Sequence, residues 1–163
     1  IGKELEQGKL DLALDIDFAC EKQVNRQFLG RTEYVVAVRR GHPILREAWD
    51  LQQYLSLGHV SVSQRKLGVN LVDMELAKRK GVTRQVRLRV GYNVHVPSVL
   101  QQTNLAWTVS SACPLLDELV TLPLPLNMPQ LELFLYWHQR QNNNAANLWL
   151  RQQILQARHT HLS

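Results

Sequence analysis

Glu33–Arg39 (Glu-Tyr-Val-Val-Ala-Val-Arg) and Leu131–Trp137 (Leu-Glu-Leu-Phe-Leu-Tyr-Trp) are the two stretches of sequence that decide the fold. Both favour β-strands, and the first is apolar enough to be buried on both faces. Between them lies an almost self-contained alternation of predicted strands and helices. We therefore expect an α/β protein in which the chain leaves one lobe, builds a second and returns, with a ligand cleft between the lobes.

These two strands also set the expected lobe boundaries. Residues 1–33 and 134–163 would form a first, incomplete lobe, and residues 34–133 would form a second lobe. In the first lobe, Gly8 is expected to cap a short N-terminal helix, which leads into a strand at Leu10–Leu14. Residues 18–32 read as a loop with a short strand around 27–29.

Hydrophobic periodicity predicts the elements of the second lobe. Residues 69–80 carry valine and leucine at helical spacing on an inner face, formed by Val69, Val72 and Leu76. Residues 84–90 alternate strictly, so we expect a strand whose apolar side chains face inward while its arginines, Arg84 included, face water. Ser110 and Ser111 are expected to cap a short helix through Leu116.

A terminal helix is expected after the asparagine turn at residues 142–144. One stripe of this helix is apolar, and we expect it to cover the first lobe. The stripe consists of Ala146, Leu150, Ile154 and Ala157.

The composition is that of an ordinary globular protein, with 163 residues, 45% hydrophobic and 20% charged. A formal net charge of +5 would suit nucleic acid, but the basic residues are scattered and follow no helix-turn-helix, zinc-ligand or RNA-binding pattern. No apolar run approaches the roughly 20 residues that span a bilayer, and the start has neither methionine nor a signal-like core. We therefore expect a cytoplasmic fragment of a longer protein, without a membrane partner.

The cysteines and histidines predict neither a metal site nor a cofactor. Cys20 and Cys113 are far apart and lack CxxC spacing, and the six histidines form no ligand pair with a carboxylate at helical spacing. The sequence also lacks the motifs of nucleophile elbows, phosphate-binding loops and zinc proteases. A binding protein is therefore expected rather than an enzyme.

Several motifs follow one another along the chain. Leu5–Leu14 reads Leu-Glu-Gln-Gly-Lys-Leu-Asp-Leu-Ala-Leu, Tyr34–Pro43 reads Tyr-Val-Val-Ala-Val-Arg-Arg-Gly-His-Pro, and Val99–Ser110 reads as a helix, a turn and a strand. In this order they resemble the C-terminal effector-binding domain of LysR-type transcriptional regulators. Leu135–His138 and Ala146–Leu150 resemble the ending of the branch that contains nodulation and aromatic-catabolism regulators.

The resemblance covers nearly the whole chain and implies a periplasmic-binding-protein type II fold, with two Rossmann-like lobes joined by two crossover strands. It implies a small-molecule effector and a homodimer or tetramer. It also implies that an N-terminal helix-turn-helix, through which the whole protein would contact DNA, is absent here together with the start of the first lobe. Ser110 departs from the family, which usually has proline there.

Carried over residue by residue, the resemblance selects effector-binding positions that also follow the ends of predicted strands, where α/β folds hold ligands. They are Asp15, Ile16, Asp17, Ser63, Gln64, Arg65, Tyr92, Asn93 and Val94. We expect Arg65 to meet an anionic effector, because a guanidinium can pair a carboxylate through two hydrogen bonds. The alternatives are a surface arginine at this position, a plain helix cap at Asn93, and solvated loop carboxylates at Asp15 and Asp17.

Two other classes of protein share such a cleft. A solute-binding protein of a transport system would carry an export signal upstream of Ile1, whereas a regulator would carry a helix-turn-helix there. An enzyme domain on the same fold would turn over a substrate.

Overall fold

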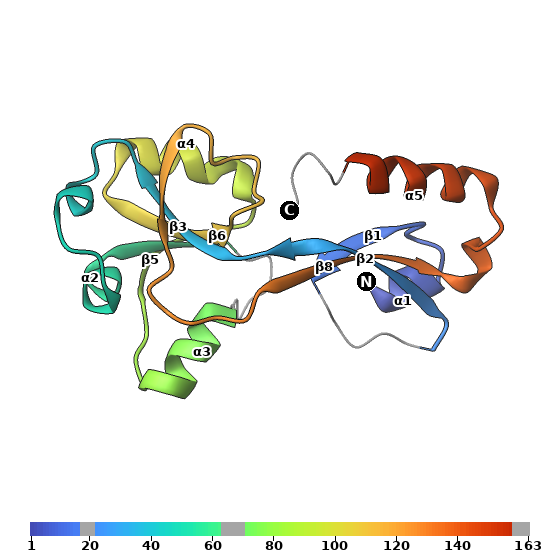
Figure 1. Cartoon of the computed structure of the whole chain (residues 1–163), viewed down its shortest axis with the longest axis horizontal. Coiled ribbons are helices and arrows are strands. Elements are labelled where there is room, and N and C mark those ends of the chain that lie inside the picture. The colour runs from blue at the N-terminus through green and yellow to red at the C-terminus, as the bar shows by residue number, and fades with distance from the viewer. Residues whose placement is uncertain (17–21, 63–70, 158–163) are drawn as a thin grey trace. The chain divides into compact units, whose positions relative to one another are not determined.

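The computed structural model describes residues 1–16, 22–62 and 71–157, and the chain divides into two compact units (Figure 1). Unit 1 is made of Ile1–Thr32 and Gln130–Ser163, and unit 2 is made of Glu33–Pro129. The chain therefore leaves unit 1 once and returns once, and each unit has its own sheet. Within the described ranges, no helix has the length and apolar character needed to cross a bilayer.

Unit 1 contains a three-stranded antiparallel sheet in the order β1-β8-β2. Its elements are α1 (Gly2–Glu6), β1 (Ala13–Ile16), β2 (Val24–Thr32), β8 (Leu131–His138), the 3-10 helix η3 (Gln139–Gln141) and α5 (Ala145–Ala157). Phe134 of β8 belongs to the core on one face of this sheet, and Leu135 belongs to the core on the other. The strand predicted at Leu131–Trp137 is therefore confirmed as the central strand.

β1 begins at Ala13, whereas the sequence predicted a strand from Leu10. The backbone N–H of Leu10 donates to the carbonyl oxygen of Glu4 at 3.2 Å, so this residue belongs to the turn that closes α1. Gly8 has a φ of +72° in that turn, which glycine adopts without steric cost. The prediction was therefore right about the cap and wrong about where the strand starts.

β2 is longer than predicted, because it pairs with β8 from Val24 to Thr32, with one register shift between Phe28 and Gly30. The expected short strand around residues 27–29 is a strand of 9 residues, Val24–Thr32. Its register runs from Val24 opposite His138 to Thr32 opposite Leu131. The strand was not predicted over its full length because this segment is polar. Polar side chains are tolerated on the solvated face of an antiparallel sheet.

α5 turns a largely polar face inward, so its predicted apolar stripe is only partly right. Ile154 does pack against the core of unit 1, but Leu150 is 42% exposed. The buried residues of this helix are Asn147 and Arg151. Trp149, in turn, is 61% exposed.

Specific polar contacts account for this rotation of α5. The side-chain amide of Asn147 donates to the carbonyl oxygen of Asp11 at 3.1 Å. The guanidinium of Arg151 lies 4.2 Å from the centre of the Trp137 ring and donates to the carbonyl oxygen of Asn142 at 3.3 Å. A cation above an indole is attracted to the ring face, so the arginine stem packs where an apolar residue was expected.

Unit 2 contains a five-stranded sheet in the order β5-β4-β6-β3-β7. Its elements are β3 (Tyr34–Arg39), η1 (Pro43–Arg46), α2 (Leu51–Ser56), β4 (Gly58–Val62), α3 (Leu71–Lys80), β5 (Gln85–Val90), η2 (Asn93–His95), α4 (Val96–Gln102), β6 (Leu105–Ser110) and β7 (Leu119–Pro123). β4 runs parallel to β5 and β6, whereas β3 runs antiparallel to β6 and β7. The strand predicted at Glu33–Arg39 is confirmed as β3.

Both faces of the unit 2 sheet are covered by helices. Val72 and Leu76 of α3 are fully buried in one core cluster, which confirms the predicted inner face of that helix, while Val69 lies outside the described residues. Leu100 of α4 is fully buried in a separate cluster, together with Ala37 of β3. Val36 and Val38 of β3 belong to the first cluster, with α3, whereas Ala37 belongs to the second, as expected for a strand buried on both faces.

The short helix predicted from Ser110 to Leu116 does not form. β6 continues through Ser110, and residues 111–118, all of them described, form turns. The Ser110 hydroxyl accepts the backbone N–H of Ala112 at 3.2 Å, which caps a turn and not a helix. Pro114 also removes one N–H that a helix would need after its first turn.

Candidate functional site

The carboxyl ends of β4, β5 and β6 lie at one edge of the unit 2 sheet, because β4 runs parallel to both neighbours. α3 follows β4 and α4 follows β5, and the two helices pack into different core clusters on opposite faces. Open α/β sheets hold ligands at such an edge, where successive connections leave on opposite sides. The turns after β4 and β5 are therefore candidate binding segments of unit 2.

Three predicted site residues, Tyr92, Asn93 and Val94, lie together in the turn after β5. Tyr92 is 61% exposed and Val94 is 62% exposed, so both present apolar surface at the sheet edge. Asn93 is the first residue of η2, and its side chain has no hydrogen-bond partner among residues 1–16, 22–62 and 71–157. It is not a helix cap, and its amide is available to a ligand.

Asp15 and Ile16 lie within β1 of unit 1, opposite Phe134 and Leu133, and not beyond the end of a parallel strand as predicted. The sheet that contains them is antiparallel, and β1 starts later than expected because the preceding residues close the turn after α1. A carboxylate oxygen of Asp15 accepts the backbone N–H of Ile16 at 2.8 Å.

The remaining predicted site residues fall on segments that the structure leaves undescribed. They are Asp17, Ser63, Gln64 and Arg65. Their roles remain predictions from the sequence.

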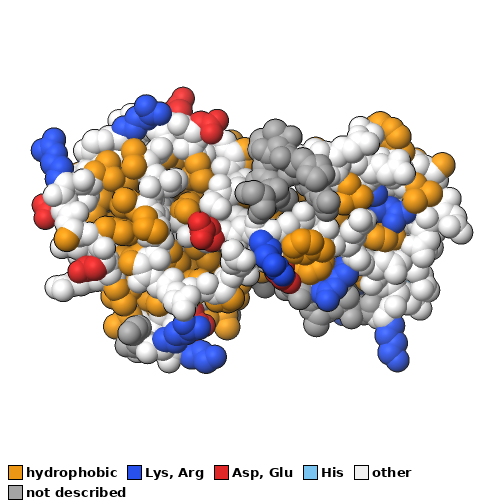
Figure 2. All heavy atoms as spheres, viewed as in Figure 1, with side chains coloured by type: hydrophobic (Ala, Val, Ile, Leu, Met, Phe, Trp, Pro, Cys, Tyr) orange, Lys and Arg blue, Asp and Glu red, His pale blue; other side chains and the backbone are white. Residues whose placement is uncertain are grey.

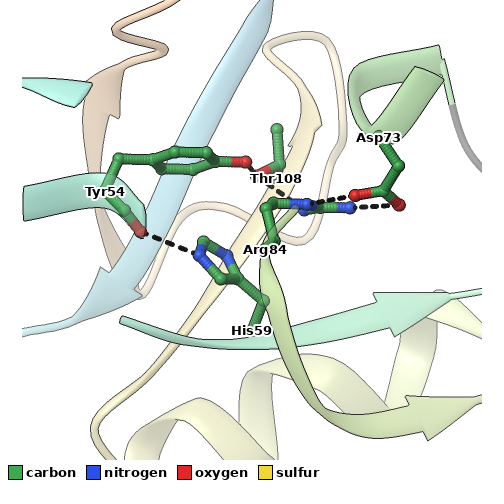
Figure 3. Close-up of polar contacts among 5 residues, drawn as sticks. All are labelled: Tyr54, His59, Asp73, Arg84 and Thr108. Carbon is green, nitrogen blue, oxygen red and sulfur yellow. Dashed lines mark hydrogen bonds and ion pairs between the residues drawn. The ribbon is translucent and has the colours of Figure 1, made fainter. Parts of the chain in front are cut away.

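A buried polar cluster lies inside unit 2, and Figure 3 shows its members, Tyr54, His59, Asp73, Arg84 and Thr108. Arg84 donates from Nε and Nη2 to the two carboxylate oxygens of Asp73, at 2.7 and 2.9 Å. Its Nη1 donates to the Thr108 hydroxyl at 3.2 Å, and this hydroxyl lies 2.9 Å from that of Tyr54. We call these five residues the Arg84 cluster.

His59 of β4 completes the Arg84 cluster and is fully buried. Its Nε2 lies 2.9 Å from the carbonyl oxygen of Tyr54, which fixes a hydrogen on this nitrogen. Burial and the positive charge of Arg84 lower the pKa of His59 to about 4, so the ring is neutral at pH 7. Nδ1 of His59 and the hydroxyl of Ser61 have no hydrogen-bond partner among the described residues.

The Arg84 cluster connects the elements that carry the candidate binding turns. Asp73 belongs to the first turn of α3, Thr108 to β6 and Tyr54 to α2, while Arg84 immediately precedes β5. Burial alone would lower the pKa of Arg84, but its hydrogen bonds to Asp73 and the nearby negative charge raise it. The charge pair is thus internal and satisfied, and it joins α3 to the start of β5.

The sequence prediction placed Arg84 in water, which is wrong. Arg87 and Arg89 are exposed as predicted, because they alternate with apolar residues along β5. Arg84, however, shares the even numbering of Val86 and Leu88, so strict alternation already separates it from the exposed arginines. The burial of Arg84 could therefore have been expected from its position among the inward-facing, even-numbered residues.

A family model described as the LysR substrate binding domain matches residues 1–158. The HTH-type transcriptional activator NahR of Pseudomonas putida is 32% identical over 152 residues, which make up 91% of this chain and 50% of NahR. NagR of Ralstonia sp, also an HTH-type transcriptional activator, gives the same identity over 154 residues. The chain spans about half the length of these curated relatives.

Solved structures show the same architecture. The regulatory domain of MexT, a transcriptional activator in Pseudomonas aeruginosa, has a TM-score of 0.78 and 24% identity, covering 96% of this chain and 78% of that domain. The effector binding domain of QuiR in complex with shikimate has a TM-score of 0.75 and 16% identity, covering 99% of this chain and 78% of that domain. The fold is therefore an α/β fold of the periplasmic-binding-protein type II kind.

Proposed function

The chain belongs to the family of LysR substrate-binding domains, and from that premise we propose that it senses a small anionic effector for a DNA-binding transcriptional regulator. The observation that carries this proposal is the turn after β5, where Tyr92, Asn93 and Val94 are exposed at the carboxyl edge of parallel strands. The curated relatives are transcriptional activators, which favours a sensor over a transport solute-binding protein. They also give no reason to expect catalysis.

We propose all nine predicted positions as effector-binding residues. Arg65 would pair the anionic group of the effector, since a guanidinium matches a carboxylate in two hydrogen bonds. Ser63, Gln64 and Asn93 would donate or accept further hydrogen bonds, while Tyr92 and Val94 would pack against the apolar part of the effector. Asp15, Ile16 and Asp17 would contribute from unit 1.

The proposed assembly and location follow the family. The two units would act as two lobes whose arrangement the effector favours unequally, so that binding shifts an equilibrium between conformations. The complete protein would be a cytoplasmic homodimer or tetramer, and it would contact DNA through a separate N-terminal domain. QuiR binds shikimate, which is a carboxylate, and this supports an anionic effector for the present chain.

Two experiments test this function. The coding sequence upstream of Ile1 should specify a helix-turn-helix, whereas an export signal there would support the solute-binding alternative. The chain should also bind at least one member of a carboxylate panel containing shikimate, benzoate and succinate in calorimetry. Binding only of uncharged analogues of these acids would contradict an anionic effector.

A further inference from the structure

Unit 2 contains a cavity of about 330 Å³ beside β3 and β7. It lies at the same edge of the sheet as the candidate turns, because Tyr34 pairs with Ser110 at the carboxyl end of β6. It is covered by residues 124–129, which follow β7, and Figure 2 shows hydrophobic side chains gathered on this face of unit 2. Every residue of its lining belongs to unit 2. The lining consists of Glu33, Tyr34, Pro123, Leu124, Leu126, Asn127, Met128 and Pro129.

The covering segment is held in place by contacts outside the cavity. The indole N–H of Trp49 donates to the carbonyl oxygen of Pro123 at 2.7 Å, at one end of the segment. Arg79 donates to the carbonyl oxygen of Asn127 at 2.8 Å, near the other end, and is itself ion-paired with Glu75. The segment that covers the cavity is thus fixed near both of its ends, and proline restricts its backbone in between.

Apolar side chains form one part of the cavity wall, and polar atoms form the rest of its accessible surface. Leu124, Leu126 and Met128 are half-buried and pack against the same core cluster as Tyr34. Ligand pockets typically have volumes of roughly 300 to 1,000 Å³, so this cavity suits a molecule with a single ring. Methionine adapts its shape easily, which helps such a wall to close around a small ring.

The polar groups of the cavity favour a cation. Glu33 is its only charged lining residue, and among the described residues its carboxylate has no ion-pair partner. The Tyr34 hydroxyl also has no partner within the described part of the chain, and burial raises the pKa of Tyr34, so the phenol remains neutral. A carboxylate ligand would meet repulsion from Glu33, whereas an ammonium group would pair with it.

We propose that this cavity binds small aromatic amines, with the ring between Leu124, Leu126 and Met128 and the ammonium group at Glu33. This site lies beside β3 and β7, whereas Tyr92, Asn93 and Val94 follow β5 on the opposite side of the sheet. The two sites also differ in the charge of their ligands. It also contains Glu33 and Pro129, the two residues of unit 2 at which the chain enters and leaves this unit. An amine bound there would restrain both connections and would couple to any effector that changes them.

The test uses three probes of similar size and different charge: 2-phenylethylamine, 2-phenylethanol and phenylacetate. Each is titrated into the 163-residue chain and followed by calorimetry and by the indole N–H resonances in NMR spectra. The amine should bind tightest and phenylacetate weakest. The indole N–H of Trp49 should shift because it is bonded to the cover, while that of exposed Trp149 should stay in place.

Glu33→Gln isolates the role of charge, because it keeps the backbone carbonyl that accepts the N–H of Ser111. This variant should lose about two- to fivefold in affinity for the amine, the size of an exposed ion pair, and should bind the alcohol as before. Glu47→Gln, another exposed glutamate, should leave both affinities unchanged. Met128→Trp should fill the cavity and abolish binding of all three probes.

Equal affinities for the three probes, a wild-type amine affinity in Glu33→Gln, or an unmoved Trp49 resonance at saturation would each overturn the proposal. The Trp49 readout needs no substitution, so the proposal can be judged even if Met128→Trp does not fold. Failure of the carboxylate panel would leave this result unaffected, because the two experiments probe different sites.

Discussion

Arg84 and Asp73 face each other as a two-pronged ion pair, with arginine Nε and Nη2 at 2.7 and 2.9 Å from the two carboxylate oxygens. The arginine side chain has no exposed surface, and that of the aspartate is 22% exposed. The pair joins the first turn of α3 to the start of β5 (Figure 3). Removal of either partner would leave a charge or an unsatisfied donor inside the protein.

Asp73→Asn is expected to lower the free energy of unfolding by about 3 kcal/mol, because it leaves the buried Arg84 charge without its counterion. Urea unfolding followed by circular dichroism measures the difference. Asp117→Asn, at an exposed carboxylate, is the matched control and should change stability by less than about 0.5 kcal/mol. A similar, small effect of both substitutions would show that the ion pair contributes little.

The lowered pKa of His59 should make the folded chain less stable as the pH falls. Its pKa is about 4 in the folded chain, against an ordinary value of 6.5, so the unfolded chain takes up a proton first. The contribution of neutral His59 is complete above pH 6.5 and is lost between pH 6.5 and 4. The free energy of unfolding should therefore be lower by about 2 kcal/mol at pH 5 than at pH 7.

His59→Gln keeps an N–H donor for the carbonyl oxygen of Tyr54 and removes the titration. Its free energy of unfolding should therefore differ less between pH 7 and pH 5 than that of the wild-type chain. His95→Gln, at an exposed histidine, should retain the wild-type difference. An unchanged pH dependence in His59→Gln would rule out His59 as the titrating group.

Arg65→Ala is expected to weaken binding of an anionic effector by about 1 to 3 kcal/mol, through loss of hydrogen bonds to a charged group. Calorimetry with the best carboxylate of the panel measures the change. Arg46→Ala, at an exposed arginine of unit 2, should bind as the wild type does. Unchanged affinity in Arg65→Ala would remove this residue from the proposed site.

Arg151→Ala should destabilise unit 1, because the guanidinium stacks on Trp137 and donates to the carbonyl oxygen of Asn142. The expected loss is about 1 to 2 kcal/mol of unfolding free energy, measured by urea titration. Gln152→Ala changes the neighbouring, exposed residue of α5 and should be nearly neutral. Equal effects of the two substitutions would argue against a structural role for the buried arginine.

Much of the fold could be predicted from the sequence, because apolar periodicity decides which segments enter a buried sheet. The stretches Glu33–Arg39 and Leu131–Trp137 became β3 and β8 with nearly the predicted bounds. α3 also formed with two of its predicted inner residues, Val72 and Leu76, buried. These elements owe their positions to burial of contiguous apolar surface, which sequence patterns report directly.

Three of the errors share a different cause, since each depends on a specific polar contact between distant or non-periodic residues. The start of β1 is set by a hydrogen bond from Leu10 to Glu4, and the rotation of α5 is set by contacts of Asn147 and Arg151. Arg84 is buried because Asp73 neutralises it. The hydrophobic pattern of a sequence does not indicate such polar contacts.

The candidate site could be predicted only in part. Tyr92, Asn93 and Val94 do occupy the turn at the carboxyl edge, because the end of β5 follows from its strict alternation. Asp15 and Ile16 were misplaced, because the position of their strand depends on the preceding turn. The cavity under residues 124–129 has no sequence motif, since its lining comes from both ends of unit 2.

The contrast between exposed Trp149 and the buried Trp107 and Trp137 gives the chain an intrinsic fluorescent probe. Unit 1 contains Trp137 and Trp149, which are 8% and 61% exposed, and unit 2 contains Trp49 and the almost fully buried Trp107. Iodide should therefore quench the emission of Trp149 selectively. With this signal removed by Trp149→Phe, the remaining fluorescence would report the melting of Trp137 and of the unit 2 core without labelling.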